Sequence, residues 1–485
     1  MAARRSRWIR RAPLVAAAGV LAFVAPSSVR AAPAARADAR PNVVVVLVDD
    51  MGWSDIGAYG GEIPTPNLDA LARGGVRFTQ FYATPRCSPT RASLLTGLYP
   101  HQAGMGHLDN VVRAGSSGTT GRLNDRSVTI AEVLREAGYF TAMSGKWHLG
   151  QDHGSPPWQR GFDRVLSLRA GGMYFPNQNF SGGDDALTAR AREPLYLDGI
   201  PTPRDAPVFG DNWYATDLWT DFGLRFVDDA RQANKPFFLY LPYNAVHYPM
   251  HAPSKYLERF AGLEPERRTY AAMLAAVDDG AGEIVRTLDR AGIRDNTLVA
   301  FLADNGATTE ARAGLGQRPA TAGSNAPYRG YKFSLFDGGM HVPAILNWPG
   351  VIPPKQVIRE VAMSADVLPT LCSAAGVSLP ADRTIDGRDI LPLAAAGARS
   401  PHGEVCWAQG NQLAVRRANW KLVLNGITYD GSPDGRKPLP GDDAVFLSDL
   451  DQDPGETRNL RRQRPELVDE LTSAIHRWRE TVTAK

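Results

Sequence analysis

Four segments of the chain consist mainly of apolar residues, many of them β-branched or aromatic. They are residues 42–48 (NVVVVLV), 139–143 (YFTAM), 237–241 (FFLYL) and 297–303 (TLVAFLA). A continuous apolar run of this kind is typical of a strand buried on both faces. Amphipathic patterns between and beside these runs predict helices at 67–73, 129–137, 216–233 and 268–290. Strands that alternate with helices predict an α/β fold with a parallel sheet covered by helices.

The pattern changes after about residue 365. A helical segment at 365–375 is followed by short strand-like runs at 404–408, 413–416, 421–424 and 444–447, and then by a helical pattern at 465–481. We therefore expect a main domain at 38–364 and a smaller α+β domain at 365–485. Three stretches rich in polar residues, glycine or proline predict long loops at 151–212, 307–328 and 425–443. The first two follow strands that carry candidate site residues, so we expect them to form walls of a substrate site.

The first 37 residues have the pattern of an export signal followed by a flexible segment. Arginines at 4–11 precede an apolar core at 14–24, which is too short to span a bilayer, and small residues allow cleavage after Ala31 or Ala37. Arg-Arg pairs at 4–5 and 10–11 leave both the Sec and the twin-arginine route open. The chain is expected to be periplasmic or secreted, with an uncleaved anchor as the alternative; no later run is long enough for a membrane span.

The charge balance excludes one class of partner. The 485 residues include 54 Lys and Arg and 51 Asp and Glu, and seven of the arginines lie in the first 37 residues, which contain no acid. The rest of the chain is therefore mildly acidic. A nucleic-acid-binding protein carries a basic patch or stripe, and this sequence has none, so nucleic acid is not expected as a partner.

Polar residues follow the predicted strands at their carboxyl ends. Asp49 and Asp50 follow the first run, and Asp304 and Asn305 follow the last. Ligands of open α/β sheets bind outside these strand ends. Carboxylate and amide oxygens suit a hard divalent cation, and Ca²⁺ accepts a crowded set of them. Such residues also cap turns after strands, but two pairs after two buried strands favour a metal site over capping.

Two lysines and two histidines are candidates for binding an anion and for proton transfer. Lys146 and His148 follow the second strand, His247 follows the third, and Lys332 lies in a later loop. Clustered together, such groups would stabilise oxyanion charge and move protons. Each is weak evidence alone, since a lysine is commonly a solvated surface charge and His247 could be a core histidine. Lys146 and His148 would point alike if the chain between them is extended.

The chain has three cysteines, Cys87, Cys372 and Cys406. An odd number allows at most one disulfide, which leaves one cysteine to explain in an exported protein. Cys372 and Cys406 lie in apolar segments, whereas Cys87 begins CSPTRASLLTG, a predicted short helix with Pro89 in its first turn. Cys87 would thus lie at a helix N-terminus, which favours anions, with Arg91 one turn along. A buried cysteine beside a surface arginine is the alternative.

Taken together, these motifs resemble those of the sulfatase family, and more closely its arylsulfatase-like bacterial members. The similarity covers most of the chain after the export segment. Its motifs are PNVVVVLVDDMGWSDIGAYGG (41–61), TPNLDALARGGVRF (65–78), CSPTRASLLTGLYPHQAGMGHL (87–108), AEVLREAGYFTAMSGKWHLG (131–150), ADNGA (303–307), RGYKFSLFDGGMHVPAI (329–345) and LSDLDQDPGETRNL (447–460). The resemblance implies an alkaline-phosphatase-like fold, with a large mixed, mostly parallel sheet between helices.

The resemblance also implies an activity, the hydrolysis of sulfate esters. In that family the cysteine of C-x-P-x-R, here Cys87, is converted to formylglycine by a separate maturation enzyme. The hydrated aldehyde attacks sulfur through one hydroxyl, and the other then expels sulfate. Roles implied for the remaining positions are Ca²⁺ ligation by Asp49, Asp50, Asp304, Asn305 and the modified Cys87, formylglycine support by Arg91, sulfate binding by Lys146 and Lys332, leaving-group protonation by Lys332 or His247, and a base at His148.

One motif departs from the family pattern, and two other functions stay open. His341 stands where the family often has an arginine, which removes a permanent charge and could alter packing or substrate range. A phosphate or phosphonate monoester hydrolase of the same superfamily would have a similar site. An unconverted protein that binds sulfated glycans is the non-enzymatic alternative. The natural sulfate ester and the oligomeric state are not predicted from the sequence.

Overall fold

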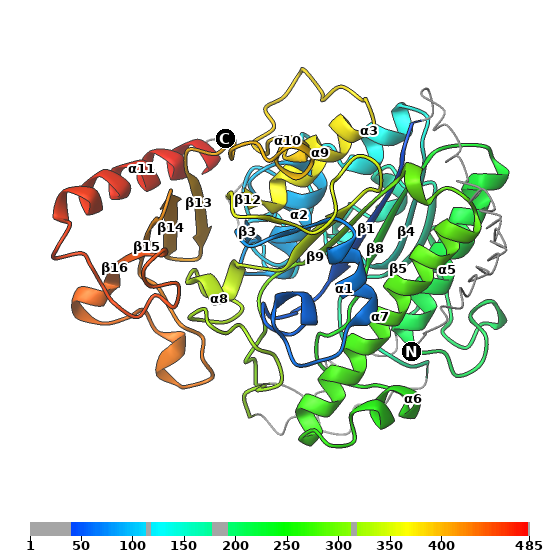
Figure 1. Ribbon diagram of the computed structural model, residues 1–485, viewed down its shortest axis with the longest axis horizontal. Helices are drawn as coiled ribbons and strands as arrows, with labels where there is room; N and C mark the ends of the chain where they lie inside the picture. The colour runs from blue at the N-terminus through cyan, green and yellow to red at the C-terminus, as the bar shows by residue number, and fades with distance from the viewer. Residues whose placement is uncertain (1–39, 113–117, 177–192, 312–317, 484–485) are drawn as a thin grey trace, which may run out of the picture. The chain divides into compact units, whose positions relative to one another are not determined.

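The computed structural model describes residues 40–112, 118–176, 193–311 and 318–483; the predicted export segment lies outside them. Ten strands in these residues form one mixed sheet (Figure 1). Its order is β11 (Gln356–Ile358), β2 (Val76–Phe78), β10 (Ala344–Asn347), β9 (Thr297–Ala303), β1 (Asn42–Val48), β8 (Phe237–Pro242), β4 (Phe140–Lys146), β5 (Arg164–Leu168), β6 (Leu195–Leu197) and β7 (Ile200–Thr202). The five strands from β9 to β5 are parallel. The four predicted strands are among them, which confirms the α/β prediction.

Helices cover both faces of the sheet. Figure 1 shows α5 (Ala215–Gln232) and α7 (Pro265–Arg290) on one side, where α7 also contacts α1 (Pro66–Arg73) and α6 (Ser254–Leu257). Helices α2 (Cys87–Thr96), α3 (Ile130–Glu136), α9 (Val367–Ala374) and α10 (Leu391–Ala396) cover the other. Every residue of β1 and β9 is buried. The apolar composition of these strands therefore reflects burial from both sides.

A second sheet lies toward the C-terminus. Strands β13 (Val405–Gln409), β14 (Gln412–Arg417), β15 (Trp420–Leu424) and β16 (Val445–Asp449) form an antiparallel meander. One face packs against α11 (Pro465–Thr483), and the opposite face packs against α8 (Asp337–Met340) and the short pair β3 (Phe81–Tyr82) and β12 (Ala362–Met363). The predicted short strands and terminal helix are thus present within one or two residues of their expected bounds.

The predicted long loop at 151–212 is wrong in its described part. It contains β5, which extends the parallel sheet, and the antiparallel pair β6 and β7 at the sheet's edge. β5 contains Arg164 and Ser167 among its apolar residues, and β6 and β7 have three residues each, so no long apolar run marks them. None of the described helices has the length and apolar character needed to cross a membrane.

Candidate active site

Three neighbouring parallel strands deliver polar residues to one edge of the sheet. The backbone N–H of Asp49, after β1, donates to the carbonyl of Ala245, after β8, at 2.9 Å. The N–H of Asp304, after β9, donates to the carbonyl of Val48, also at 2.9 Å. The hydrogen-bond ladders therefore continue past the strand ends and hold these carboxylates side by side, as expected for the carboxyl edge of a parallel sheet.

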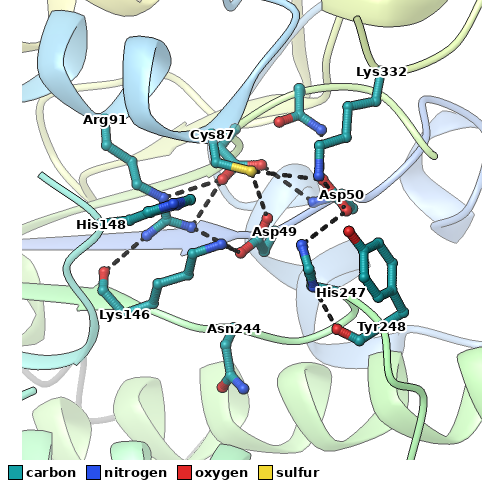
Figure 2. A network of polar contacts seen from close by, with 12 residues as sticks. Asp49, Asp50, Cys87, Arg91, Lys146, His148, Asn244, His247, Tyr248 and Lys332 are labelled. Carbon is teal, nitrogen blue, oxygen red and sulfur yellow. Dashed lines mark hydrogen bonds and ion pairs between the residues drawn. The ribbon is translucent and has the colours of Figure 1, made fainter. Parts of the chain in front are cut away.

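Cys87 is the first residue of α2, and its side chain lies against this edge (Figure 2). The Sγ atom is 3.3 Å from Oδ1 of Asp49 and 3.9 Å from Oδ1 of Asp50. The residue is 1% exposed. All three cysteines are buried and free. The predicted helix N-terminus at Cys87 is confirmed, and burial raises the pKa of its thiol well above the usual value, with Asp49 adding to the effect.

Three cationic side chains surround the carboxylates. Arg91 donates from Nε and Nη2 to Oδ2 of Asp304 at 3.2 and 2.8 Å. Lys146 donates to Asp49, and Lys332 donates to Oδ2 of Asp50 at 2.9 Å. Figure 2 shows Arg91, Lys146 and Lys332 pointing inward from different elements toward Cys87, Asp49 and Asp50. Arg91 is therefore no surface arginine; it is fully buried.

The acidic residues form a donor set that fits a hard cation. One ligand atom from each of Asp49, Asp50, Cys87 and Asp304 can be chosen so that all four lie within 4.8 Å of one another. The Nδ2 of Asn305 donates to Asp50 at 2.7 Å. Its Oδ1 is buried and has no hydrogen-bond partner among the described residues. Burial of an amide oxygen without a hydrogen-bond donor costs free energy unless a cation binds it. The aspartates of the cluster supply carboxylate oxygens, which Ca²⁺ prefers.

Crowding separates the pKa values of the three carboxylates. Burial raises the pKa of Asp50 to about 6, in spite of Lys332. Burial, followed by the charge of Asp49, raises the pKa of Asp304 to about 7. Burial opposes ionisation of Asp49 as well, but Lys146 and the other cations outweigh it and hold the pKa of Asp49 well below its usual value. Like charges in a buried site produce this pattern.

The two histidines are neutral at pH 7. Burial lowers the pKa of His148 to about 4, in spite of Asp109, whose Oδ1 lies 3.3 Å from His148 Nε2. The Nδ1 of His148 has no hydrogen-bond partner in the described chain. Burial and Lys332 lower the pKa of His247, whose Nδ1 lies against the carbonyl of Tyr248 and whose Nε2 is 3.7 Å from Asp50. His247 is therefore a site residue.

Two glycines permit the close approach of the site's loops. A Cβ at Gly145, where φ is +138°, would lie 2.1 Å from the carbonyl oxygen of Pro242. A Cβ at Gly306 would lie 1.9 Å from the carbonyl oxygen of Gly338. A side chain at Gly145 would thus push β4 off β8, and one at Gly306 would push α8 off the segment that follows β9. The backbone N–H of Lys332 donates to the Ala307 carbonyl at 2.9 Å, which ties the Lys332 loop in place.

The structure brings together all ten predicted site residues: Asp49, Asp50, Cys87, Arg91, Lys146, His148, His247, Asp304, Asn305 and Lys332. The chain is not extended at His148, where φ is +58°, yet Lys146 and His148 line one cavity of about 100 Å³ with Cys87, His247 and Lys332. The chain turns at His148 without moving its side chain out of the site.

Three residues of the cavity wall are not singled out by the sequence pattern, although one of them lies in the loop 307–328 that is expected to form a wall. Asp109 contacts His148, while Glu310 and Tyr248 lie beside Lys332. Their loops carry no periodic pattern, and only contact with a predicted residue reveals them. Conversely, Asn244 follows β8 as a candidate would, but its side chain turns away (Figure 2) and bonds Trp219 and the backbone at Met173.

His341 lies outside the cavity in a buried polar cluster. Its Nδ1 is 3.1 Å from the Asp337 carboxylate and its Nε2 is 2.9 Å from the Thr79 carbonyl. The ring stacks on Tyr82 with centroids 4.7 Å apart. Lys421, from the C-terminal sheet, donates to Asp337 at 2.6 Å. His341 therefore packs between the two sheets, nine residues along the chain from Lys332.

Comparison with known proteins agrees with this geometry. The sequence model described as Sulfatase matches residues 41–377. The chain is 36% identical to N-acetylgalactosamine-6-sulfatase of Canis lupus familiaris over 75% of this chain and 68% of the relative. It is 34% identical to Homo sapiens arylsulfatase A over 87% of this chain and 83% of that protein. A solved structure, Ps i-CgsB in complex with k-i-k-neocarrahexaose, is 28% identical with a TM-score of 0.74 and covers 90% of this chain and 92% of that chain.

The chain belongs to the sulfatase family. It is accordingly an enzyme of the class that hydrolyses sulfate esters. A phosphonate monoester hydrolase of Agrobacterium radiobacter has the same fold, with 21% identity, a TM-score of 0.60 and coverage of 91% of this chain and 96% of its own.

Proposed function

We propose that this enzyme cleaves sulfate monoesters with a formylglycine made from Cys87 by a separate maturation enzyme and with one bound Ca²⁺. The observation that carries the proposal is the contact of Cys87 Sγ with Asp49, 3.3 Å apart, where Cys87 lines a cavity together with two lysines and two histidines of the predicted site. Hydrated formylglycine would supply a hydroxyl nucleophile and a second hydroxyl through which sulfate can leave. A thiol with its pKa raised by burial is a poor nucleophile.

The oxygen donors of the site would hold the cation. Asp49, Asp50 and Asp304 supply carboxylates, Asn305 supplies its orphaned Oδ1, and the modified residue 87 completes the set. The ion would act as a Lewis acid and as a template for the sulfate group. Arg91 is already committed to Asp304 and Asp49, so its part is to hold these ligands in place.

The remaining residues divide into anion binders and proton carriers. Lys146 and Lys332 present ammonium groups to the cavity and would bind the sulfate oxygens. Lys332 is the better donor to the leaving oxygen, because the Nδ1 proton of His247 faces the carbonyl of Tyr248. Neutral His148, with Nε2 against Asp109 and Nδ1 unpartnered among the described residues, would accept the proton released when sulfate is expelled.

The substrate we propose is an aryl or carbohydrate sulfate. The relatives named above act on arylsulfate and N-acetylgalactosamine 6-sulfate by their names, and the solved neighbour holds an oligosaccharide. We also propose that the chain is exported through the signal in its first 37 residues, because their basic, apolar and small-residue segments follow the order of a signal peptide.

The test compares nitrophenyl sulfate with nitrophenyl phosphate, using protein made in a host that performs the cysteine conversion. We expect faster turnover of the sulfate, loss of activity after prolonged chelation, and recovery when Ca²⁺ is restored. Faster turnover of the phosphate would overturn the proposed substrate. Activity that survives complete removal of divalent ions would overturn the proposed cofactor.

A further inference from the structure

Glu310 is a buried carboxylate in the wall of the cavity, next to a sulfate-binding lysine. Its Oε2 is 3.0 Å from Lys332 Nζ and accepts a hydrogen bond from the Tyr248 hydroxyl, also at 3.0 Å. Its side chain is 5% exposed. One ligand atom each of Glu310, Asp50 and His247 can be chosen within 4.8 Å of one another. Glu310 therefore lines the same cavity as Cys87 and Lys332, and its charge affects any anion that binds there.

The negative charge of Glu310 affects which ester charge the site binds best. The buried network around Cys87 contains three carboxylates and three cations: Asp49, Asp50, Asp304, Arg91, Lys146 and Lys332. A divalent cation in the proposed site adds positive charge to this network, and the Glu310 carboxylate beside Lys332 lowers the positive charge that an anion meets there. A sulfate monoester carries a single negative charge, whereas a phosphate monoester, with its second pKa near 6, carries close to two at pH 8.

We propose that Glu310 is a specificity-determining residue that makes the site prefer monoanionic sulfate esters over dianionic phosphate esters. The inference rests on the proposed function, because it needs a cation at the acidic cluster and an anion beside Lys332. If the ester carried a second negative charge, Lys332 would lie between that charge and the Glu310 carboxylate. Solvent screens the repulsion between two such buried negative charges only weakly. The sulfate ester avoids that repulsion and still contacts the Lys332 ammonium.

Asp109 is another carboxylate of the described cavity wall that contacts a predicted site residue. Its surroundings differ from those of Glu310. It contacts the neutral imidazole of His148, and its side chain is 13% exposed. Its effect on the anion is therefore weaker and acts on a step that both kinds of ester share. A role for Glu310 limited to holding Lys332 would also affect both esters alike. Only a charge effect changes the ratio between them.

The experiment measures kcat/KM for nitrophenyl phosphate and nitrophenyl sulfate at pH 8 with saturating Ca²⁺. The variants are Glu310→Gln, which keeps the shape and removes the charge, and Glu310→Asp, which keeps the charge. We expect Glu310→Gln to raise the phosphate-to-sulfate ratio by about tenfold, as one unit charge a few ångströms away can do. Glu310→Asp should keep the ratio within about twofold of the unmodified chain. Tyr248→Phe, which removes a contact of Glu310 but no charge, should also leave it unchanged.

Glu283→Gln is the matched control, since Glu283 lies on the outer surface of α7 and its side chain is 38% exposed. An unchanged ratio in Glu310→Gln, or an equal rise in Glu310→Asp, would overturn the inference. If Glu310→Gln does not fold, Glu310→Ala gives the same comparison. These results are separate from the proposed substrate, which is overturned if the unmodified chain prefers the phosphate; a chain that prefers sulfate with an unaltered ratio in Glu310→Gln contradicts the inference alone.

Discussion

Arg91 and Asp304, 213 residues apart in the chain, form a fully buried ion pair. Nε and Nη2 of the guanidinium donate to one carboxylate oxygen at 3.2 and 2.8 Å, and neither side chain is exposed. Nη1 donates to the carbonyl of Lys146 at 2.9 Å. Arg91 thus joins the start of α2 to the ends of β9 and β4. The same contacts that hold the site together also join these elements of the fold.

Replacing Arg91 with Ala should therefore destabilise the protein. Removal of one partner leaves the carboxylates of Asp304 and Asp49 buried without their cation, which costs about 3–5 kcal/mol. Urea unfolding followed by circular dichroism measures this loss. Arg286→Ala removes an exposed ion pair with Glu283 and should cost less than about 1 kcal/mol. Equal losses in the two variants would contradict the structural role of Arg91.

Asn305→Ala should weaken the binding of Ca²⁺. The substitution removes the orphaned Oδ1 and the hydrogen bond to Asp50. A ligand that binds only the folded state raises the melting temperature, so the concentration of Ca²⁺ needed for that rise should increase about tenfold or more. Asn411→Ala, at an exposed position in the turn between β13 and β14, is the control. A Ca²⁺ titration of Asn305→Ala that matches the control would place the ion elsewhere.

His148 should make the folded state less stable in acid. Its pKa is about 4 in the folded protein, because of burial, against 6.5 in the unfolded chain. The unfolded chain therefore binds the extra proton between these values, and the free energy of unfolding falls as the pH drops from 6.5 toward 4. His148→Gln removes this contribution, of about 1–3 kcal/mol.

The check compares urea unfolding at pH 7.5 and 4.5, in chelator, for both chains. The unmodified chain should lose more stability than His148→Gln on going to pH 4.5, while the acidic cluster contributes equally to both and cancels. His153→Gln changes a histidine that also lines the cavity and tests whether the effect belongs to His148. Parallel losses in all three chains would show that His148 is not held neutral by the fold.

Lys421→Ala should destabilise the contact between the two sheets. Lys421 of β15 is fully buried between Asp337 and Glu456, at 2.6 and 3.1 Å. Its loss leaves the carboxylates of Asp337 and Glu456 buried without their lysine, at a cost of about 3–5 kcal/mol. Thermal unfolding measures it, with Lys437→Ala, an exposed lysine, as the control. Unchanged stability would mean that the pair contributes nothing to joining α8 and the C-terminal sheet.

The sequence predicts the long buried strands well because burial on both faces leaves an unbroken apolar run. β1 and β9 have the expected bounds. Short strands such as β5 and β6 gain their stability from neighbours in the sheet, and so their own residues carry no clear pattern. The antiparallel β10, between β9 and β2, is missed for the same reason.

The residues of the candidate site also divide into those that the sequence predicts and those that it misses. Asp49 and Asp304 are found because strand ends in a parallel sheet meet at one edge. Glu310 and Asp109 are not found, because their position depends on how loops fold back over that edge. Asn244 has the right place in the chain, but Trp219 of α5 draws its amide to the other side. Side-chain direction after a strand depends on tertiary contacts that the pattern does not contain.

In the active enzyme, residue 87 should be an aldehyde. The most direct test is the mass of the peptide that carries Cys87, measured on the same preparation whose sulfatase activity is assayed, with Cys87→Ala as the inactive control. We expect a peptide lighter by about 18 Da than the thiol form, because a carbonyl oxygen replaces the thiol and one hydrogen, and its proportion should follow the activity. A fully active preparation with an unmodified, alkylatable thiol at residue 87 would contradict it.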